Sequence, residues 1–416
     1  MAWVTKGFLI AVIMLLPAWA QAVDLSGRIK LDANRYDAGP DTAEALVGQQ
    51  TSGDLSGQLR LELQQRLSAW QLDAAWQLDA RHGSAVKRDS TLTTLVPQLD
   101  YRNTDDSYWD LDSPITDSNA TQSHQRIDRL SATYSQTDYV VRLGRQALTW
   151  GSGQVFHPLD LVNPFQPVAT DTAYKHGTDM AYAQWLFENG SDLQFAYVPH
   201  RNRNTLDPDG NKDTTAIYAN LVSTQLQWNL LLAQDYADTV AGLNVSGPLA
   251  GTVWNLALVP TRLESGTTYT SALANITLAT TFLDRNLNSF AEFYHNGFGE
   301  SGRDYSLADL NPQLLLRLQR GQVFVTGRDY LSVGATWDMT PLLQLIPTLI
   351  YNLHDHSSLL DTQASYSLSD NVSLKAGLRL AFGGQGSEFA GLRYLPNVPL
   401  YLAQSNQGFI RLDAYF

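Results

Sequence analysis

The sequence predicts an all-β protein: a transmembrane, antiparallel, up-and-down β-barrel of about eighteen strands. Two observations carry this prediction. Segments of about ten residues alternate between apolar and polar side chains, and short turns between these segments alternate with long loops. The last segment, residues 408–416, is the clearest example, because Ile410 and Leu412 share one face while Arg411 and Asp413 share the other.

Residues 1–22 are predicted to be a secretory signal peptide. One lysine, Lys6, precedes an apolar run that ends at Leu16, and the small-residue triplet Ala20-Gln21-Ala22 marks a cleavage site. The run is shorter than the roughly twenty apolar residues that a membrane-spanning helix needs. We therefore expect an exported mature chain, residues 23–416, that forms a single outer-membrane barrel.

The composition fits a barrel and argues against several other classes of protein. Hydrophobic residues make up 44% of the chain, which includes 10 Trp and 19 Tyr, yet they are dispersed in alternation rather than gathered in a second apolar run. The absence of cysteine excludes disulfides, thiolate metal sites and cysteine nucleophiles. The formal charge is −13, or −14 without Lys6, and an acidic exported chain argues against nucleic-acid binding.

The alternating segments can be followed in order along the chain. Residues 81–125, rich in Asp, Ser, Thr and Asn, are predicted to be one long surface loop, and Asn189-Gly190 indicates a tight hairpin turn. A soluble β-helix would show a short repeat of fixed period, which the sequence lacks. The expected strands are residues 24–36, 54–66, 69–80, 126–134, 139–147, 179–187, 192–198, 215–221, 225–233, 239–245, 252–259, 269–278, 289–295, 330–339, 343–353, 360–368, 372–382 and 408–416.

One long loop, residues 149–178, differs from the others because it is apolar. A freely solvated loop would not carry so much apolar surface, so we expect it to fold back into the lumen and to form a constriction. For His157 and Asp160, an alternative of equal weight is that they only satisfy the local backbone. The side chains expected at the constriction are Trp150, Phe156, His157, Asp160 and Phe165.

Closure of the barrel would bring the first and last strands together. Their inward faces and those of their neighbours carry more basic than acidic side chains, and such a track would concentrate and guide anions. The alternative, slightly favoured, is a mesh of ion pairs that only stiffens the wall. The acidic positions are Asp32, Glu62 and Asp413, and the basic positions are Arg28, Lys30, Arg60, Lys375, Arg379 and Arg411.

The stretch from Gly144 to Phe165 reads GRQxLxWGxGxxFxPxDxxNPF. It resembles a signature of porin-like outer-membrane proteins of Proteobacteria, and the size and layout of the chain resemble eighteen-stranded substrate-specific porins and alginate-export-type barrels. The terminal Phe416 resembles the assembly signal of Gram-negative outer-membrane barrels. The resemblance implies a location in the outer membrane, contact with its lipid and recognition by the barrel-assembly machinery, and it leaves the oligomeric state open.

A barrel of about eighteen strands is too wide for side chains alone to fill it. We therefore predict passive diffusion of small hydrophilic solutes, with a weak preference for anionic ones. Two alternatives remain: an outer-membrane enzyme that acts on lipids, and a structural sleeve for a periplasmic or surface partner. The histidines are scattered and no nucleophile stands beside one in a local motif, so no catalytic residue is assigned.

Two smaller segments, a histidine-rich turn and a short apolar stretch, also carry predictions. His354-Asp355-His356 fits a solvated turn better than a metal site, so neither a metal nor a cofactor is expected. Residues 311–320, NPQLLLRLQR, are predicted to form a short amphipathic helix that serves as a lid or fills the lumen.

Overall fold

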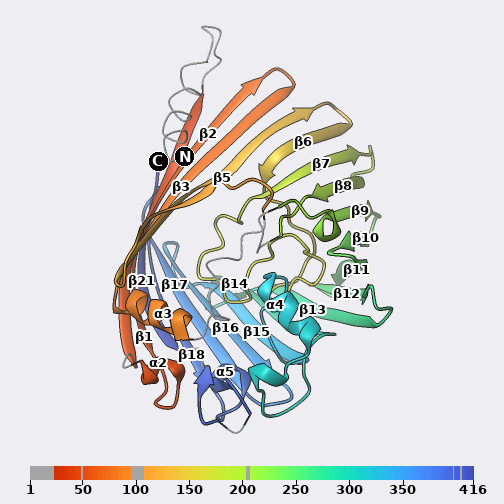
Figure 1. The fold of residues 1–416 in the computed structure, drawn as a ribbon. Helices are drawn as coiled ribbons and strands as arrows, with labels where there is room; N and C mark the ends of the chain where they lie inside the picture. The colour runs from red at the N-terminus through yellow and green to blue at the C-terminus, as the bar shows by residue number, and fades with distance from the viewer. Residues whose placement is uncertain (1–22, 48–49, 96–106, 203–206, 397, 403–404) are drawn as a thin grey trace.

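The structure, a computed structural model, is a ring of eighteen antiparallel strands closed into a barrel (Figure 1). It describes residues 23–47, 50–95, 107–202, 207–396, 398–402 and 405–416. The predicted signal peptide, residues 1–22, lies outside the described residues. No helix in these ranges is both long and apolar enough to cross a bilayer.

Each barrel strand pairs with the barrel strands before and after it in the sequence, and the ring closes where β1 pairs with β21. The barrel strands are β1 (Asp24–Asp37), β2 (Thr51–Leu67), β3 (Trp70–Gly83), β5 (Thr121–Ser135), β6 (Tyr139–Gln146), β7 (Thr178–Leu186), β8 (Asp192–Val198), β9 (Thr214–Val222), β10 (Gln227–Asp235), β11 (Asp238–Leu249), β12 (Thr252–Arg262), β13 (Thr268–Phe282), β14 (Arg285–His295), β15 (Asp329–Asp338), β16 (Leu343–Asn352), β17 (Ser358–Ser369), β18 (Val372–Phe382) and β21 (Asn406–Tyr415).

The remaining elements lie in the connections. A short strand, β4, pairs with the first part of β5. It lies along the same edge of β5 that pairs with β6 in its second part. The strands outside the ring are β4 (Asp112–Asp117) and the pair β19 (Leu392–Arg393) and β20 (Tyr401–Leu402). The helices are α2 (Ala43–Leu46), α3 (Ser84–Leu95), α4 (Pro312–Gln319) and α5 (Glu388–Gly391), with 3-10 turns η3 (Gly210–Lys212) and η4 (Leu307–Asp309).

The predicted fold class and the eighteen predicted strands are confirmed, although several strands are longer than predicted. The prediction of a single polar loop over residues 81–125 is wrong. β3 continues to Gly83, α3 and β4 follow, and β5 already begins at Thr121. The residues that extend these strands, such as Arg81 and Gln122, are polar and pair with each other at the loop end of the sheet. Strands there lose the apolar alternation on which the prediction depended.

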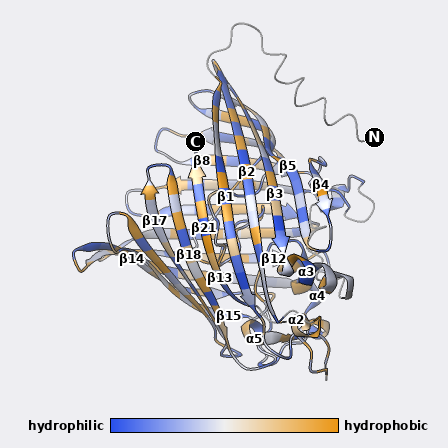
Figure 2. Ribbon diagram, turned by 90° about the vertical axis from the view of Figure 1, so that its left-hand side faces the viewer, coloured by the Kyte–Doolittle hydropathy of each residue, from blue (hydrophilic) through white to orange (hydrophobic). Residues whose placement is uncertain are grey.

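Along the strands, side chains alternate between an apolar outer face and a polar interior (Figure 2). On β21, Ile410 is 58% exposed on the outside, whereas Asp413 is fully buried inside. On β1, Leu31 is 53% exposed and Arg28 only 2%. Because closure pairs every strand on both edges, the apolar outer face can contact lipid without unpaired backbone groups.

The two ends of the barrel differ. Short turns join the strands at the end where β1 begins and β21 ends, while α2, α3, α4 and α5 lie at the other end (Figure 2). An outward row of aromatic rings, Trp70, Tyr134, Tyr139 and Trp185, follows the short-turn end with centroids 4.9–6.0 Å apart. Such a girdle marks a membrane–water interface, and short turns are typical of the periplasmic side.

Two local features that were predicted outside the strands, a turn and a helix, are also present. The Asn189-Gly190 turn is confirmed, because Gly190 has a φ of 82° and its N–H donates to the Phe187 carbonyl at 3.0 Å. The predicted amphipathic helix is α4, and the side chain of its N-cap residue, Asn311, accepts from the Gln313 N–H at 2.9 Å. Its Leu314 is fully buried in a cluster with other apolar loop residues.

We expect that placing a charge on the outer face destabilises the barrel according to its depth. Ile410→Arg lies six positions from the terminal Phe416 and should cost about 2–4 kcal/mol, the cost of arginine near the middle of a bilayer. Leu283→Arg, in the β13–β14 turn at the rim, should cost about 0–1 kcal/mol. Urea unfolding in lipid vesicles measures both, and equal costs would contradict the assigned membrane position.

Candidate functional site

The segment between β6 and β7, residues 147–177, lies inside the barrel, and we call it the inner loop. Its first and last parts follow the inner wall in the order of the strands. Its middle turns back toward the base of the loop, where Asp160 pairs with Lys175 and Asn163 donates to Thr178 at the start of β7. Figure 1 shows it within the ring of strands. Residues 150–156 contact β8, β9, β11, β12, β13, β14 and β15, and residues 168–177 contact β18, β21, β1, β2 and β5.

The first half of the inner loop packs on aromatic side chains of the wall. The Trp150 ring stacks on Tyr218 with centroids 5.2 Å apart, and its Nε1 donates to Gln194 Oε1 at 2.8 Å. Phe156 stacks on Tyr294 at 4.4 Å. Both loop rings are nearly inaccessible to solvent. These contacts give the physical reason for the apolar composition of the loop, since its side chains complete a core on the lumen side of the wall.

One wall carboxylate holds the backbone of this half. Glu292 on β14 is 1% exposed, and it accepts hydrogen bonds from three consecutive loop N–H groups. The Gln154 N–H donates to Oε2 at 2.6 Å, and the N–H groups of Val155 and Phe156 donate to Oε1 at 3.0 and 2.9 Å. Bonds of this kind are charge-assisted and stronger than neutral ones. The tight turn requires Gly153, because a Cβ there would lie 1.7 Å from the Phe156 carbonyl oxygen.

The second half of the loop is held by basic side chains of the opposite wall. Asp171 accepts from Arg28 at 3.0 and 2.7 Å and from Lys30 at 2.9 Å. Burial opposes ionisation of Asp171, but these bonds outweigh it and hold the pKa of its carboxyl below the ordinary value. Arg411 donates to the Thr170 carbonyl at 2.7 Å. The guanidinium of Arg60 lies 4.2 Å from the centre of the Tyr174 ring.

The six basic side chains predicted to form a track face the interior on neighbouring strands. Each of them has a carboxylate partner within 4 Å. Arg28, Arg60 and Arg411 are 5% exposed or less, whereas Lys375 keeps 26% of its side chain exposed. The pairs are Arg28 and Lys30 with Asp171, Arg60 with Asp128 and Glu62, Lys375 with Asp413, Arg379 with Asp361, and Arg411 with Asp32.

A cluster around Asp128 on β5 joins this network and escaped the sequence analysis. Its carboxylate lies 2.6 Å from a nitrogen of Arg60, of Arg126 and of Arg129. Asp128 is the extra residue of a β-bulge opposite the Ala75–Trp76 step of β3. The bulge breaks the strict alternation of the strand, so that Asp128 and Arg129 both reach the interior. The only signal in the sequence is the crowding of charges in a strand that is otherwise regular.

The remaining predicted constriction residues are Asp160, His157 and Phe165 of the inner loop. Asp160 is 4% exposed, and its Oδ2 lies 2.6 Å from Lys175 Nζ, so this pair ties together the two halves of the loop. Burial raises the pKa of Asp160 to about 6, against the effect of Lys175. Burial, helped by Lys175, lowers the pKa of His157 to about 4, and this imidazole is therefore neutral at pH 7. Phe165 is half-buried.

The terminal residue and the histidine-rich turn have local partners. Phe416 exchanges backbone hydrogen bonds with Gly27 on β1 at 3.0 and 3.1 Å; its role as an assembly signal stays a prediction. His354 Nε2 lies 2.6 Å from Asp329 Oδ2, and His356 Nδ1 lies 2.9 Å from the Tyr351 hydroxyl. Within the described part of the chain, no group of three or more His, Cys, Asp or Glu residues is placed to hold a metal ion.

No protein-family model and no curated protein sequence matches the chain. Solved structures do match. OccK7 (OpdD) of Pseudomonas aeruginosa gives a TM-score of 0.52 at 13% identity, over 95% of this chain and 98% of that one. A BenF-like porin from Pseudomonas fluorescens Pf-5 gives 0.55 at 7% identity, over 96% and 100%, and OccAB4 of Acinetobacter baumannii gives 0.53 at 8%, also over 96% and 100%.

The fold is that of an eighteen-stranded outer-membrane porin. The predicted resemblance to substrate-specific porins is thereby confirmed for the architecture. At these identities the likeness concerns the porin fold alone.

We expect Glu292→Ala to loosen the first half of the inner loop. Three backbone N–H groups would lose their acceptor, at about 1–3 kcal/mol for each buried group left unpaired. Cleavage of the folded barrel by a protease within residues 147–177 should therefore become faster. Glu292→Gln, which keeps one oxygen for Val155 and Phe156, should lie between this variant and the wild type. Unchanged resistance of the Ala variant would show that the aromatic contacts alone hold the loop.

Proposed function

We propose that the protein is a passive channel for small hydrophilic solutes across the outer membrane. The observation that carries this proposal is the course of the inner loop. The contacts of its first and last parts lie on walls at opposite sides of the lumen, as expected of a segment that crosses and narrows a pore. The porin fold supports the same function, as does an interior whose side chains are polar and hydrogen-bonded.

Single-channel recording in planar bilayers tests this proposal against the two alternatives. A channel gives stable current steps whose size grows linearly with voltage. A barrel without such steps that hydrolyses membrane lipid would be an enzyme, and one that stays bound to another protein during mild detergent extraction would be a sleeve. Either result in place of current steps would overturn the channel proposal.

We further infer that the inner loop sets the narrowest part of the pore. Deletion of residues 155–167 removes the segment that stacks on Tyr294 and the carboxyl partner of Lys175, and should raise the conductance in molar KCl. Retention of the folded barrel can be checked by its resistance to unfolding in cold detergent. An unchanged conductance in a correctly folded variant would assign the constriction to another loop.

The preference for solute charge should be weak. Every basic side chain of the predicted track already has a carboxylate partner, so a permeating ion meets much less field than six free cations would produce. On the same side of the barrel, Asp73 and Asp79 add negative charge, and the glutamines that donate hydrogen bonds to them do not neutralise it. A residual preference for anions would come chiefly from Lys375, the most exposed of the six.

Carboxylates are the anions to test first. One of the structural neighbours, OpdK of Pseudomonas aeruginosa, at a TM-score of 0.54 and 12% identity, was solved with vanillate, which carries a carboxylate. For the present chain a carboxylate solute could exchange with the Lys375–Asp413 pair, whose nitrogen and oxygen are 3.2 Å apart. The proposal therefore includes weak anion selectivity, with neutral solutes also admitted.

The reversal potential in a KCl gradient measures this selectivity. We expect a small preference for chloride in the wild type. Lys375→Gln should abolish or reverse this preference, because the negative charge of Asp413 would then be balanced by Arg28 alone. Lys87→Gln, on the exposed face of α3, removes one charge outside the barrel wall and should change the potential less. Strong cation selectivity that neither variant alters would remove the basic track from the mechanism.

A further inference from the structure

A row of five asparagines lines the wall that lies opposite the basic strands. Counted around the ring, β9 to β13 are half a circuit away from β21, β1 and β2. Asn229 is paired in register with both Asn220 and Asn244, and Asn255 is paired with Asn275. Asn229, Asn244, Asn255 and Asn275 are between 1% and 8% exposed.

The amides on β9, β10 and β11 are hydrogen-bonded from strand to strand, and Ser152 links them to the amides on β12 and β13. Asn229 Nδ2 donates to Asn220 Oδ1 at 3.1 Å, and Asn244 Nδ2 donates to Asn229 Oδ1 at 3.0 Å. The hydroxyl of Ser152 on the inner loop lies 3.1 Å from Asn244 Oδ1 and 2.7 Å from Asn255 Oδ1. The row is therefore held rigidly, and its orientation does not depend on a bound solute.

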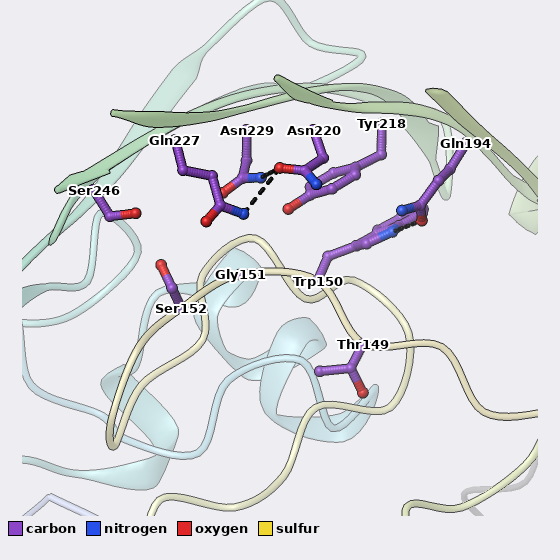
Figure 3. A pocket seen from close by; sticks show the side chains of 10 residues that line it. All are labelled: Thr149, Trp150, Gly151, Ser152, Gln194, Tyr218, Asn220, Gln227, Asn229 and Ser246. Carbon is purple, nitrogen blue, oxygen red and sulfur yellow. Dashed lines mark hydrogen bonds between the residues drawn. The ribbon is translucent and has the colours of Figure 1, made fainter. Parts of the chain in front are cut away.

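The row ends, at β9 to β11, in a pocket of about 220 Å³ between the wall and the inner loop (Figure 3). The stacked rings of Trp150 and Tyr218 lie at one side, and the side chains of Gln227 and Ser246 lie at the other. None of the residues that line the pocket is charged. This sets the pocket apart from the opposite wall, where ion pairs dominate.

Gln227 and Ser246 leave polar atoms free for a solute. Gln227 Nε2 donates to Asn220 Oδ1 at 2.9 Å, while Gln227 Oε1 and Ser246 Oγ have no side-chain partner among the described residues. Amides and hydroxyls both donate and accept hydrogen bonds, as the hydroxyls of a sugar do. An ion would lose hydration in this pocket without gaining a counter-charge. The volume lies below the range of about 300–1,000 Å³ for drug-sized ligands, so the pocket suits one small ring.

We propose that this amide pocket is a binding subsite for a neutral, polyhydroxylated solute of the size of one sugar ring. The proposal rests on the channel function, since the solute would reach the pocket from the lumen. A solute in transit would then pass between an ion-paired wall on one side and a neutral, amide-lined wall on the other.

The test uses the purified mature barrel in planar bilayers with glucose as the probe. Glucose should cause concentration-dependent interruptions of the KCl current. Gln227→Leu keeps the volume of the side chain but removes its polar atoms, and should weaken the apparent affinity about 2- to 10-fold, the factor expected for one lost hydrogen bond. Gln363→Leu, the same change on β17 outside the pocket, should leave the affinity unchanged. Gluconate, an anionic polyol of similar size, should interrupt the current less.

Each result bears on one of the two proposals. Current steps without interruptions by glucose, or interruptions that the two variants alter equally, overturn the amide pocket and leave the channel function intact. Absence of current steps would instead overturn the channel function. Glucose binding to the detergent-solubilised barrel, measured by saturation-transfer NMR, tests the pocket without conduction, and binding that Gln227→Leu does not weaken would also overturn it.

Discussion

The arrangement of the lumen depends on the pairing of the backbone of one long loop with the inner wall of the barrel. A segment inside a lumen must satisfy its N–H and C=O groups, and this one does so with a different partner in each half. In the first half, N–H groups donate to the carboxylate of Glu292. In the second half, carbonyls accept from Arg379, Arg411 and Arg129. The wall therefore needs an acid on one side and guanidinium groups on the other.

These contacts change the role that can be assigned to the basic side chains on β18, β21, β1 and β2. Positive charges on adjacent inward faces suggest a path for anions when they are considered alone. In the folded protein much of their hydrogen-bonding capacity is used to hold the loop, and their charge is balanced by Asp171, Asp413, Asp32 and other carboxylates. A buried guanidinium that lost such partners would be costly, so the pairs support the architecture whatever solute passes. The charge that remains for a solute is that of the more exposed groups.

The two walls offer a solute different chemistry. One presents ion pairs, and the other presents neutral amides that are hydrogen-bonded from β9 to β11 and linked to β12 and β13 through Ser152 of the inner loop. The inner loop touches both and carries aromatic rings toward the amide side. A pore of this kind can admit solutes without a large net field, since the interactions that it offers are short-range hydrogen bonds rather than long-range attraction.

The sequence by itself determined the class of the fold, the eighteen strands and the faces of the regularly alternating side chains, because the two-residue period of a strand appears directly in alternating residue types. The apolar composition of residues 149–178 also indicated that this loop leaves the solvent. Its partners could not be predicted in this way. Arg28 and Asp171 are 143 residues apart, and the asparagine row needs the registers of several hairpins at once. The bulge at Asp128 changes which side chains face inward within a single strand. Only the closed barrel decides these contacts, because they depend on register and on the course of the loop rather than on local preference.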